Sequence, residues 1–122
     1  MNTIKEEWTQ EITYNNVCDE NGNPTGGDSK STGVSIDWQN GPLGWDYEKN
    51  TFPEGVKPNG AFVETVILHC IQRLQFFQAA ANKKFACREN AIALTKLEES
   101  LMWLQRRHNN RVVNKVQGEH KA

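Results

Sequence analysis

The sequence has no apolar run long enough to cross a membrane, and it has few cysteines. Cys18, Cys70 and Cys87 are odd in number and lie far apart, so they form no Cys-x-x-Cys pair. The polar segment NTIKEEW follows Met1, and we therefore expect no secretion signal. These features together predict reduced thiols and a protein of the cytoplasm.

The sequence also lacks recognisable catalytic and metal-binding motifs. His69, His108 and His120 are scattered singly, without the spacing of zinc ligands. It contains no nucleophile elbow, no His-Glu-x-x-His motif and no pair of carboxylates that a motif places beside a cationic pocket. We therefore predict a binding protein rather than an enzyme, with no catalytic residues, no metal and no cofactor.

The composition predicts one domain, residues 1–122, with a small core. Only 37% of the residues are hydrophobic, and a chain this poor in apolar residues often completes its core by forming oligomers. Residues 1–57 hold ten acidic and four basic residues, whereas residues 58–122 hold five acidic and ten basic residues. Either the two halves pack against each other, or the basic half meets an anion.

The pattern of residues 1–40 predicts a β-hairpin region. The segments EEWTQEITY and GVSIDWQ alternate between apolar and polar residues, as half-buried strands do. The apolar positions expected to share a face are Trp8, Ile12 and Tyr14 in the first strand and Val34, Ile36 and Trp38 in the second. The intervening NNVCDENGNPTGGDSKST predicts a long, mobile loop. Because two strands alone are barely stable, they must lie on something else.

Residues 41–59 read as a turn-rich connector, residues 60–117 as a helical hairpin and residues 118–122 as a tail. The first helix is expected to start near Asn59, a fair N-cap, and to end near Asn82. Its predicted seam is Val63, Ile67, Cys70, Leu74 and Phe77. The second helix is expected from Arg88 to about Val116. The fold class is therefore α+β, a small antiparallel β region followed by an antiparallel two-helix hairpin that oligomerises.

The second helix carries an apolar stripe that ends in polar residues. The stripe itself is Leu94, Leu97, Leu101 and Leu104. The same spacing leads back to Asn90 and Cys87 and forward to His108 and Arg111, with Arg107 beside it. One explanation is that both ends are solvated helix termini, since cations suit a helix C-terminus. The other is that they bind a ligand.

Geometry constrains the second explanation. Asn90 and Arg107 are 17 residues apart, and on one straight helix this places them about 26 Å from each other. A small ligand cannot touch both within one chain. If the helix packs antiparallel against a second copy, Asn90 of one protomer approaches Arg107 and Arg111 of its partner, and twofold symmetry makes this pocket twice.

Three phenylalanines lie near these polar ends, namely Phe76, Phe77 and Phe85. Phe77 is expected in the core, whereas Phe85 lies in the interhelix turn. Aromatic rings and guanidinium groups together suit a nucleotide, because rings stack on bases and arginine binds phosphate in a bidentate manner. A nucleic-acid-binding module and a purely structural oligomer remain alternatives, although the acidic first half disfavours the former.

Three segments of the chain resemble one family. They are IDWQNGPLG, GVKPNGAFVETVILHCIQRLQFFQ and FACRENAIALTKLEESLMWLQRR with the trailing QGEHKA. Together they resemble the phage Thoeris anti-defence sponge proteins, whose helical hairpin is shared with phage anti-CBASS cyclic-nucleotide sponges. The resemblance runs from Val34 to the C-terminus and is most specific in the RENA…ALTKLEE…WL segment.

The resemblance implies a non-enzymatic binder of cyclic ADP-ribose isomers made by TIR-domain enzymes, acting in the host cytoplasm. Some members also hold cyclic di- or trinucleotides at a separate site. It further implies a homo-oligomer built from dimers, in the form of a hexamer, with pockets shared between protomers. No membrane and no nucleic acid polymer is expected as a partner.

The resemblance also implies which residues contact the ligand. These are Asn90, Arg107 and Arg111, with Phe85 preferred over Phe77 as the stacking ring. For Arg88 it leaves two roles open, a contact to phosphate or a cap of its own helix. Family members usually carry Glu-Gly-Thr-His near the end, where this sequence has QGEH at 117–120, so no contact is carried over to that tail.

Overall fold

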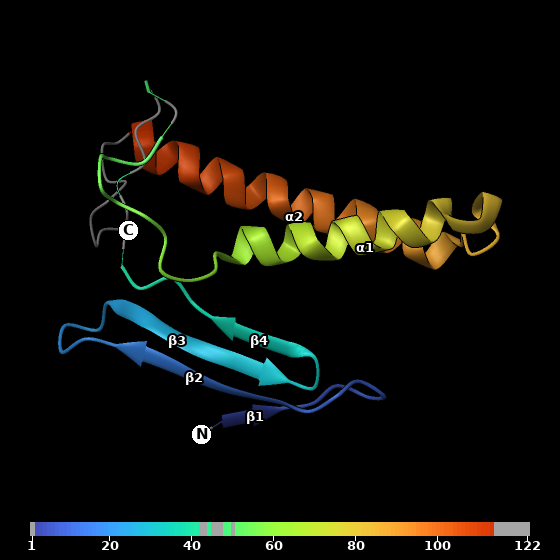
Figure 1. Ribbon diagram of the computed structural model, residues 1–122, viewed down its shortest axis with the longest axis horizontal. Coiled ribbons are helices and arrows are strands. Elements are labelled where there is room, and N and C mark those ends of the chain that lie inside the picture. The colour runs from blue at the N-terminus through green and yellow to red at the C-terminus, as the bar shows by residue number, and fades with distance from the viewer. Residues whose placement is uncertain (1, 42–43, 45–47, 50, 114–122) are drawn as a thin grey trace. The chain divides into compact units, whose positions relative to one another are not determined.

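Four strands are followed by two helices in the computed structural model of the chain, which confirms the α+β class (Figure 1). The structure describes residues 2–41, 44, 48–49 and 51–113. It divides into two compact units, Met1–Phe62 with the strands and Val63–Val113 with the helices. In the part of the chain that the structure describes, neither helix is apolar over the length that a bilayer crossing requires.

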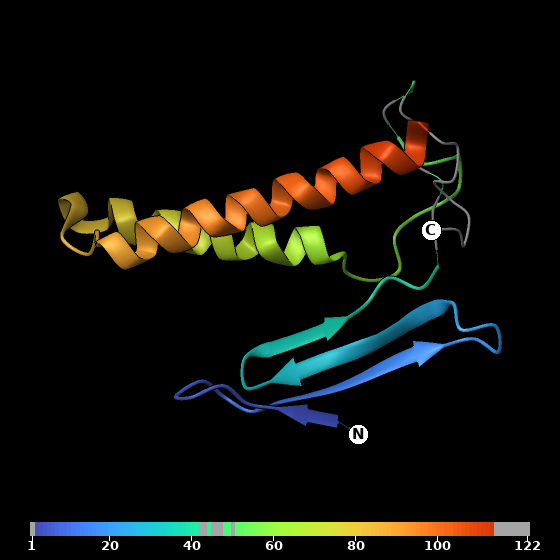
Figure 2. The ribbon, with the colours of Figure 1, turned by 180° about the vertical axis from the view of Figure 1, so that it is seen from behind.

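The sheet is antiparallel throughout, with its strands in the order β1-β2-β3-β4 (Figure 2). The strands are β1 Asn2–Ile4, β2 Ile12–Cys18, β3 Pro24–Ser31 and β4 Val34–Asp37. Each strand therefore pairs with the next one along the chain. The register places Tyr14 opposite both Asn2 and Ser29, and Ser29 opposite Ile36.

The predicted two-stranded hairpin with a long mobile loop is wrong. Most of that loop is the end of β2 and the whole of β3, joined by a turn at 19–23. The turn is ordered because the Asp19 carboxylate accepts the backbone N–H groups of Asn21 at 2.9 Å and Asn23 at 3.0 Å. Residues of β3 such as Gly, Asp and Ser have low strand propensity, and ladder hydrogen bonds override it.

Trp8 does not lie on a strand, as the sequence predicted. It belongs to the turn between β1 and β2, where its side chain is 90% exposed. The turn is tight because Glu7 has a positive φ of 43° and the Thr9 backbone N–H donates to the Glu6 carbonyl at 2.8 Å. Ile12 and Tyr14, two of its expected face partners, do lie in β2.

Asn59 does not cap the first helix, contrary to prediction. Its side-chain oxygen accepts the Asn40 N–H at 2.8 Å, and its own N–H donates to the Gln39 side chain at 2.9 Å. Next to it, Ala61 forms a parallel bridge with Trp38. These contacts hold the segment against the end of β4, so the helix begins later, at Val63.

The two helices are α1, Val63–Lys83, and α2, Arg88–Val113, and they run antiparallel side by side (Figures 1 and 2). Regular helical geometry is lost at Ala80–Asn82, where Asn82 has a φ of 55°, so the first helix ends near Asn82 as predicted. The second helix starts at Arg88 as predicted. Its predicted continuation to Val116 lies outside the described residues.

The predicted seam of α1 is only partly correct. Ile67 and Leu74 are half-buried, but Cys70 and Phe77 are exposed, and Val63 is 50% exposed. Outside the predicted seam, Ile71 is 5% exposed, and Glu64, Val66 and Gln78 are half-buried. The predicted and the observed inward positions both follow helical spacing, so spacing alone does not decide which face of α1 turns inward. The hydrogen bonds that Gln78 makes to Cys87 favour the observed face.

Burial is slight throughout the molecule. Among the described residues Ile71, which is 5% exposed, is the one buried hydrophobic side chain. Large apolar side chains at least 44% exposed on the two helices are Val63, Leu68, Phe76, Ile92, Met102 and Trp103. Such exposure is unusual for an isolated soluble domain and is typical of a surface that another molecule covers.

Candidate functional site

One face of α2 is half-buried along nearly its whole length. We call it the α2 stripe, and its members are Asn90, Leu94, Leu97, Leu101, Leu104 and His108. The apolar positions and both polar ends match the prediction from spacing. Cys87 does not belong to the stripe as predicted, because it is exposed and precedes the helix.

Cys87 instead caps the N-terminus of α2. Its Sγ accepts the Asn90 backbone N–H at 3.4 Å, and its carbonyl accepts the Ala91 N–H at 3.1 Å. The Gln78 side chain holds Cys87 from the other helix, accepting its N–H at 3.0 Å and donating to its carbonyl at 3.1 Å. The start of α2, and with it the position of Asn90, is therefore fixed by Gln78 on α1 and by Cys87 just before α2.

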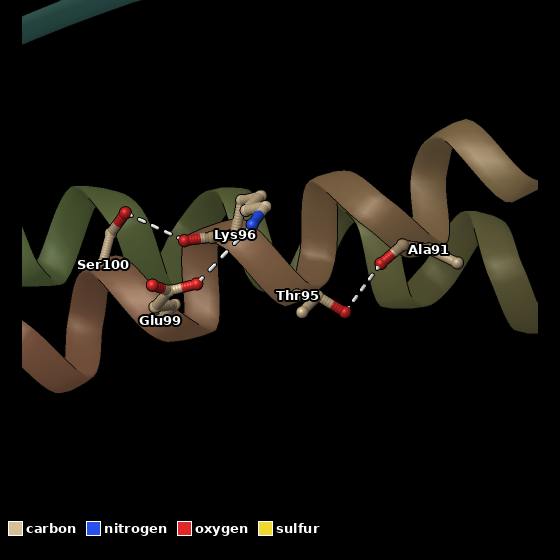
Figure 3. A network of polar contacts seen from close by, with 5 residues as sticks. All are labelled: Ala91, Thr95, Lys96, Glu99 and Ser100. Carbon is tan, nitrogen blue, oxygen red and sulfur yellow. Dashed lines mark hydrogen bonds and ion pairs between the residues drawn. The ribbon is translucent and has the colours of Figure 1, made fainter.

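Polar side chains on the outward face of α2 make their contacts within the same helix (Figure 3). The Thr95 hydroxyl donates to the Ala91 carbonyl at 3.1 Å, and the Ser100 hydroxyl donates to the Lys96 carbonyl at 2.9 Å. Lys96 also pairs with Glu99 at 3.8 Å, and both side chains are more than half exposed. This solvated pair contributes little to stability.

The predicted ligand residues fall into two groups. Phe85, Arg88 and Asn90 lie at the interhelix turn, where Phe85 is 55% exposed, Arg88 is exposed and Asn90 is half-buried. Arg107 is exposed and lies near the other end of α2. Arg111 is within α2, and its side chain is outside the described residues.

One chain does not bring the two groups together. Both belong to a single continuous helix, so Asn90 and Arg107 are separated by about 26 Å along its axis. The C-terminal end of α2 runs past the N-terminal end of α1, as Figure 1 shows.

The sequence reasoning missed contacts between cations and aromatic rings. The Arg73 guanidinium lies 5.1 Å from the Phe76 ring centre and 4.8 Å from that of Phe77. The Arg106 guanidinium lies 5.2 Å from the Trp103 ring. Spacings of three and four residues place side chains side by side on a helix, so these pairs were visible in the sequence.

Phe85 also has a cation beside it. The Lys84 ammonium lies 5.6 Å from the Phe85 ring centre, and both residues lie in the exposed turn. An exposed ring with a neighbouring cation suits an anionic ligand that has an aromatic base. The turn thus offers a ring, a cation and the Asn90 amide, while the far end of α2 offers guanidinium groups.

A metal-centred site has no support in the residues that are described. Across residues 2–41, 44, 48–49 and 51–113, no three His, Cys, Asp or Glu side chains come together as metal ligands would.

Comparison with known proteins finds similarity over about half of the chain. The family model described as the Acb2/Tad1 hairpin domain matches residues 46–107. The protein Thoeris anti-defense 1 of Bacillus phage SBSphiJ7 is 52% identical over 62 residues, which make up 51% of this chain. The matched stretch spans only 42% of the length of that phage protein.

The family match includes most of the predicted ligand residues and excludes the sheet. Phe85, Arg88, Asn90 and Arg107 lie inside it, and Arg111 lies just beyond its end. All four strands lie outside it. The resemblance inferred from sequence segments is therefore confirmed for the hairpin, while the sheet stands apart from the matched region.

Proposed function

The chain belongs to the Acb2/Tad1 hairpin-domain family, and on that premise we propose that it is a phage anti-defence protein that sequesters cyclic ADP-ribose-type immune signals. Its ligand is glycocyclic ADP-ribose made by TIR-domain enzymes, which it binds without degrading. Removal of the signal in the host cytoplasm blocks Thoeris immunity. The protein acts as a homo-oligomer built from dimers, in the form of a hexamer.

The continuity of α2 is the observation that carries this proposal. Asn90 lies at one end of the half-buried α2 stripe and the exposed Arg107 lies beside its other end, too far away for the two to meet within a chain. If α2 packs antiparallel on α2 of a second copy, Asn90 of each protomer comes to Arg107 and Arg111 of its partner. Each dimer then contains two equivalent pockets.

The residues match the chemical parts of a cyclic ADP-ribose. Its pyrophosphate is doubly charged, and the guanidinium groups of Arg107 and Arg111 bind such groups through paired hydrogen bonds. The Asn90 carboxamide offers both a donor and an acceptor to the base or a ribose. The exposed Phe85 ring is available to stack on the adenine, with Arg88 or Lys84 adding positive charge.

Calorimetry with glycocyclic ADP-ribose tests the site. Replacing both Arg107 and Arg111 by Ala removes two charge-assisted contacts, each contributing about 1.5–3 kcal/mol, so affinity is expected to fall at least roughly 100-fold. Arg106→Ala is the matched control, because it removes the adjacent charge, which lies over Trp103. An affinity of the double variant within about twofold of the Arg106→Ala protein would place the site elsewhere.

Mixing variants tests whether the pocket is shared between copies. Asn90→Ala protomers and Arg107→Ala/Arg111→Ala protomers are each expected to bind poorly on their own. In a mixed dimer one of the two pockets regains all of its residues, so half of the sites in mixed dimers should recover, which is about a quarter of all sites after random reassembly of equal amounts. No recovery after mixing and reassembly would mean that each site lies within a single chain.

The fate of the ligand separates a sponge from an enzyme. Protein is loaded with glycocyclic ADP-ribose, heat-denatured, and the released nucleotide is analysed by mass spectrometry. Intact ligand in stoichiometric amount is the expected result, whereas a cleaved product would refute sequestration. Adding a cyclic trinucleotide to the same loaded protein tests the separate second site, since binding there should not displace the first ligand.

A further inference from the structure

The interhelix turn, residues 81–87, has an unfavourable backbone conformation at its start. Ala81, Asn82 and Lys83 all have positive φ, at 50°, 55° and 70°. Residues with a Cβ rarely adopt this conformation, and a run of them persists only where the surrounding contacts hold it. Two backbone hydrogen bonds of 3.1 Å lie within the turn, each between residues three positions apart. Because both bonds are local, neither joins the turn to the body of the hairpin.

Gln78, on α1, joins the turn to that helix. Its carboxamide oxygen accepts the Cys87 N–H at 3.0 Å, and its carboxamide nitrogen donates to the Cys87 carbonyl at 3.1 Å. Cys87 is the last residue before α2, so this one side chain spans the turn. The side chain is half-buried, and its oxygen and its nitrogen are each engaged by Cys87. The polar atoms of Gln78 are therefore directed at the turn.

Three of the predicted ligand residues lie next to Cys87. Phe85 precedes it by two positions, and Arg88 follows it directly. Asn90 is joined to it, because the Cys87 Sγ accepts the Asn90 N–H at 3.4 Å. All of these residues belong to the same compact unit as Gln78. A contact that fixes the backbone of Cys87 therefore also limits where the ring, the guanidinium and the carboxamide beside it can lie.

The charge of this region opposes a fixed turn. Lys83, Lys84 and Arg88 are exposed cations, with Glu89 as the one acid among residues 83–89. Like charges this close repel one another, although their charge is also what attracts an anion. A carboxylate at position 78 would cancel part of that charge and would repel the carbonyl that the carboxamide binds. The neutral carboxamide holds the turn and leaves its positive charge intact.

We propose that Gln78 is a positioning residue of the ligand site, which holds the interhelix turn in the conformation that binds the nucleotide. The inference rests on the proposed function, because it takes the residues beside Cys87 as ligand contacts. Gln78 acts without touching the ligand, since both of its polar groups are bound to Cys87. An ordered turn favours binding, because apparent affinity is reduced by the fraction of protein that lacks the competent conformation.

Gln78→Met tests the inference by removing both hydrogen bonds. Methionine keeps the length of the side chain and has a similar helix propensity. Two hydrogen bonds at the surface stabilise the turn modestly, so we expect the affinity for glycocyclic ADP-ribose to fall about fivefold. Calorimetry on the full-length chain measures the change. Gln75→Met is the matched control, because Gln75 is exposed on the same helix, and its affinity should stay within about twofold of the wild type.

Ala81→Gly provides a rescue that acts through the backbone of the turn. Glycine adopts positive φ without a steric penalty, so this change lowers the cost of the turn but restores no bond to Cys87. Added to Gln78→Met, it should return the affinity to within about twofold of the wild type. Absence of any recovery would overturn the inference, because Gln78 would then act by a route other than the turn.

A loss of stability alone must be distinguished from a misplaced turn. Ile71→Ala is expected to destabilise the hairpin more than Gln78→Met, but it leaves both bonds to Cys87 in place. Its affinity for the nucleotide is therefore expected to stay within about twofold of the wild type. If binding weakens in proportion to stability across these variants, Gln78 has only a structural role and the inference is wrong.

Hydrogen exchange in the ligand-free protein reports on the turn directly. Residues 84–88 should exchange faster in the Gln78→Met protein than in the Gln75→Met protein, and equal exchange would overturn the inference. Wild-type protein that does not bind the nucleotide would overturn the proposed function and, with it, this inference. Wild-type binding together with equal affinities of the Gln78→Met and Gln75→Met proteins would overturn this inference alone.

Discussion

The turn between β2 and β3 and the turn between α1 and α2 are both held by one side chain, but in different ways. The Asp19 carboxylate accepts two backbone N–H groups only two and four residues ahead. The Gln78 carboxamide reaches nine residues along the chain and binds both polar groups of Cys87. The first turn is therefore a local motif, whereas the second joins two helices.

The same difference extends through the two compact units. The sheet unit depends on backbone ladders and on side-chain amides such as Gln39 and Asn59, and none of its described residues is buried. The helical unit depends on side-chain packing around Ile71 and the α2 stripe. We infer that the sheet is most sensitive to changes in backbone geometry and the hairpin to loss of apolar volume.

Gly27→Ala is the strongest way to break the sheet. Gly27 has a φ of +126°, and a Cβ there would lie 2.1 Å from the Asn15 carbonyl oxygen. Because the opposing atom belongs to the backbone of β2, the strands must separate, and we expect a loss of about 4 kcal/mol. Hydrogen exchange measured by mass spectrometry should show rapid exchange in β2 and β3, with α1 and α2 still protected.

Gly22→Ala is the matched control for that change. Gly22 also has a positive φ, +81°, but a Cβ there would meet nothing within 4 Å. Only backbone strain remains, with an expected cost of about 1 kcal/mol. Equal effects of the two substitutions would show that strain alone matters and that the close approach of β2 to β3 does not.

Ile71→Ala is the corresponding test of the hairpin. Ile71 is 5% exposed, and its truncation leaves a cavity between the helices, so about 3 kcal/mol should be lost. Chemical denaturation followed by helical circular dichroism measures the change, and β2 and β3 should keep their protection from exchange. Leu68→Ala, on the same helix but 55% exposed, should cost less than about 1 kcal/mol. If Ile71→Ala speeds hydrogen exchange in β2 and β3 as much as in α1 and α2, the proposed difference between the sheet unit and the helical unit is wrong.

The hairpin could be predicted from the sequence because its signals are local and periodic. The spacing of Leu94, Leu97, Leu101 and Leu104 placed the inward face of α2, and Asn82 marked the end of α1. The rotation of α1 was only partly predicted. Cys70 and Phe77 are as compatible with helical spacing as Ile71 and Gln78, and the choice depends on a bond to Cys87 that spacing does not encode.

The sheet was harder to predict because its strands are specified by their neighbours. The segment PTGGDSKS has no apolar alternation, and it forms β3 through hydrogen bonds to strands on both sides. Similarly, Asn59 looked like a helix cap, but residues 39 and 40 compete for its hydrogen bonds. For the candidate site, residue types and spacing predicted two separated groups, while their union in one pocket depends on a second copy and stays a prediction.

Gln78→Ala has the smallest expected effect and gives the finest test of the difference between the turns. The substitution removes both bonds to Cys87, but Cys87 is exposed and water can replace them, so about 1 kcal/mol should be lost. The Cys87 amide should exchange faster, whereas the N–H of Asn90 keeps its partner in the Cys87 thiol. Gln75→Ala is the matched control, because Gln75 is exposed on the same helix and gains the same helix propensity. Equal stability of the Gln78→Ala and Gln75→Ala proteins would mean that packing alone sets the rotation of α1, and that the contact between Gln78 and Cys87 follows from it.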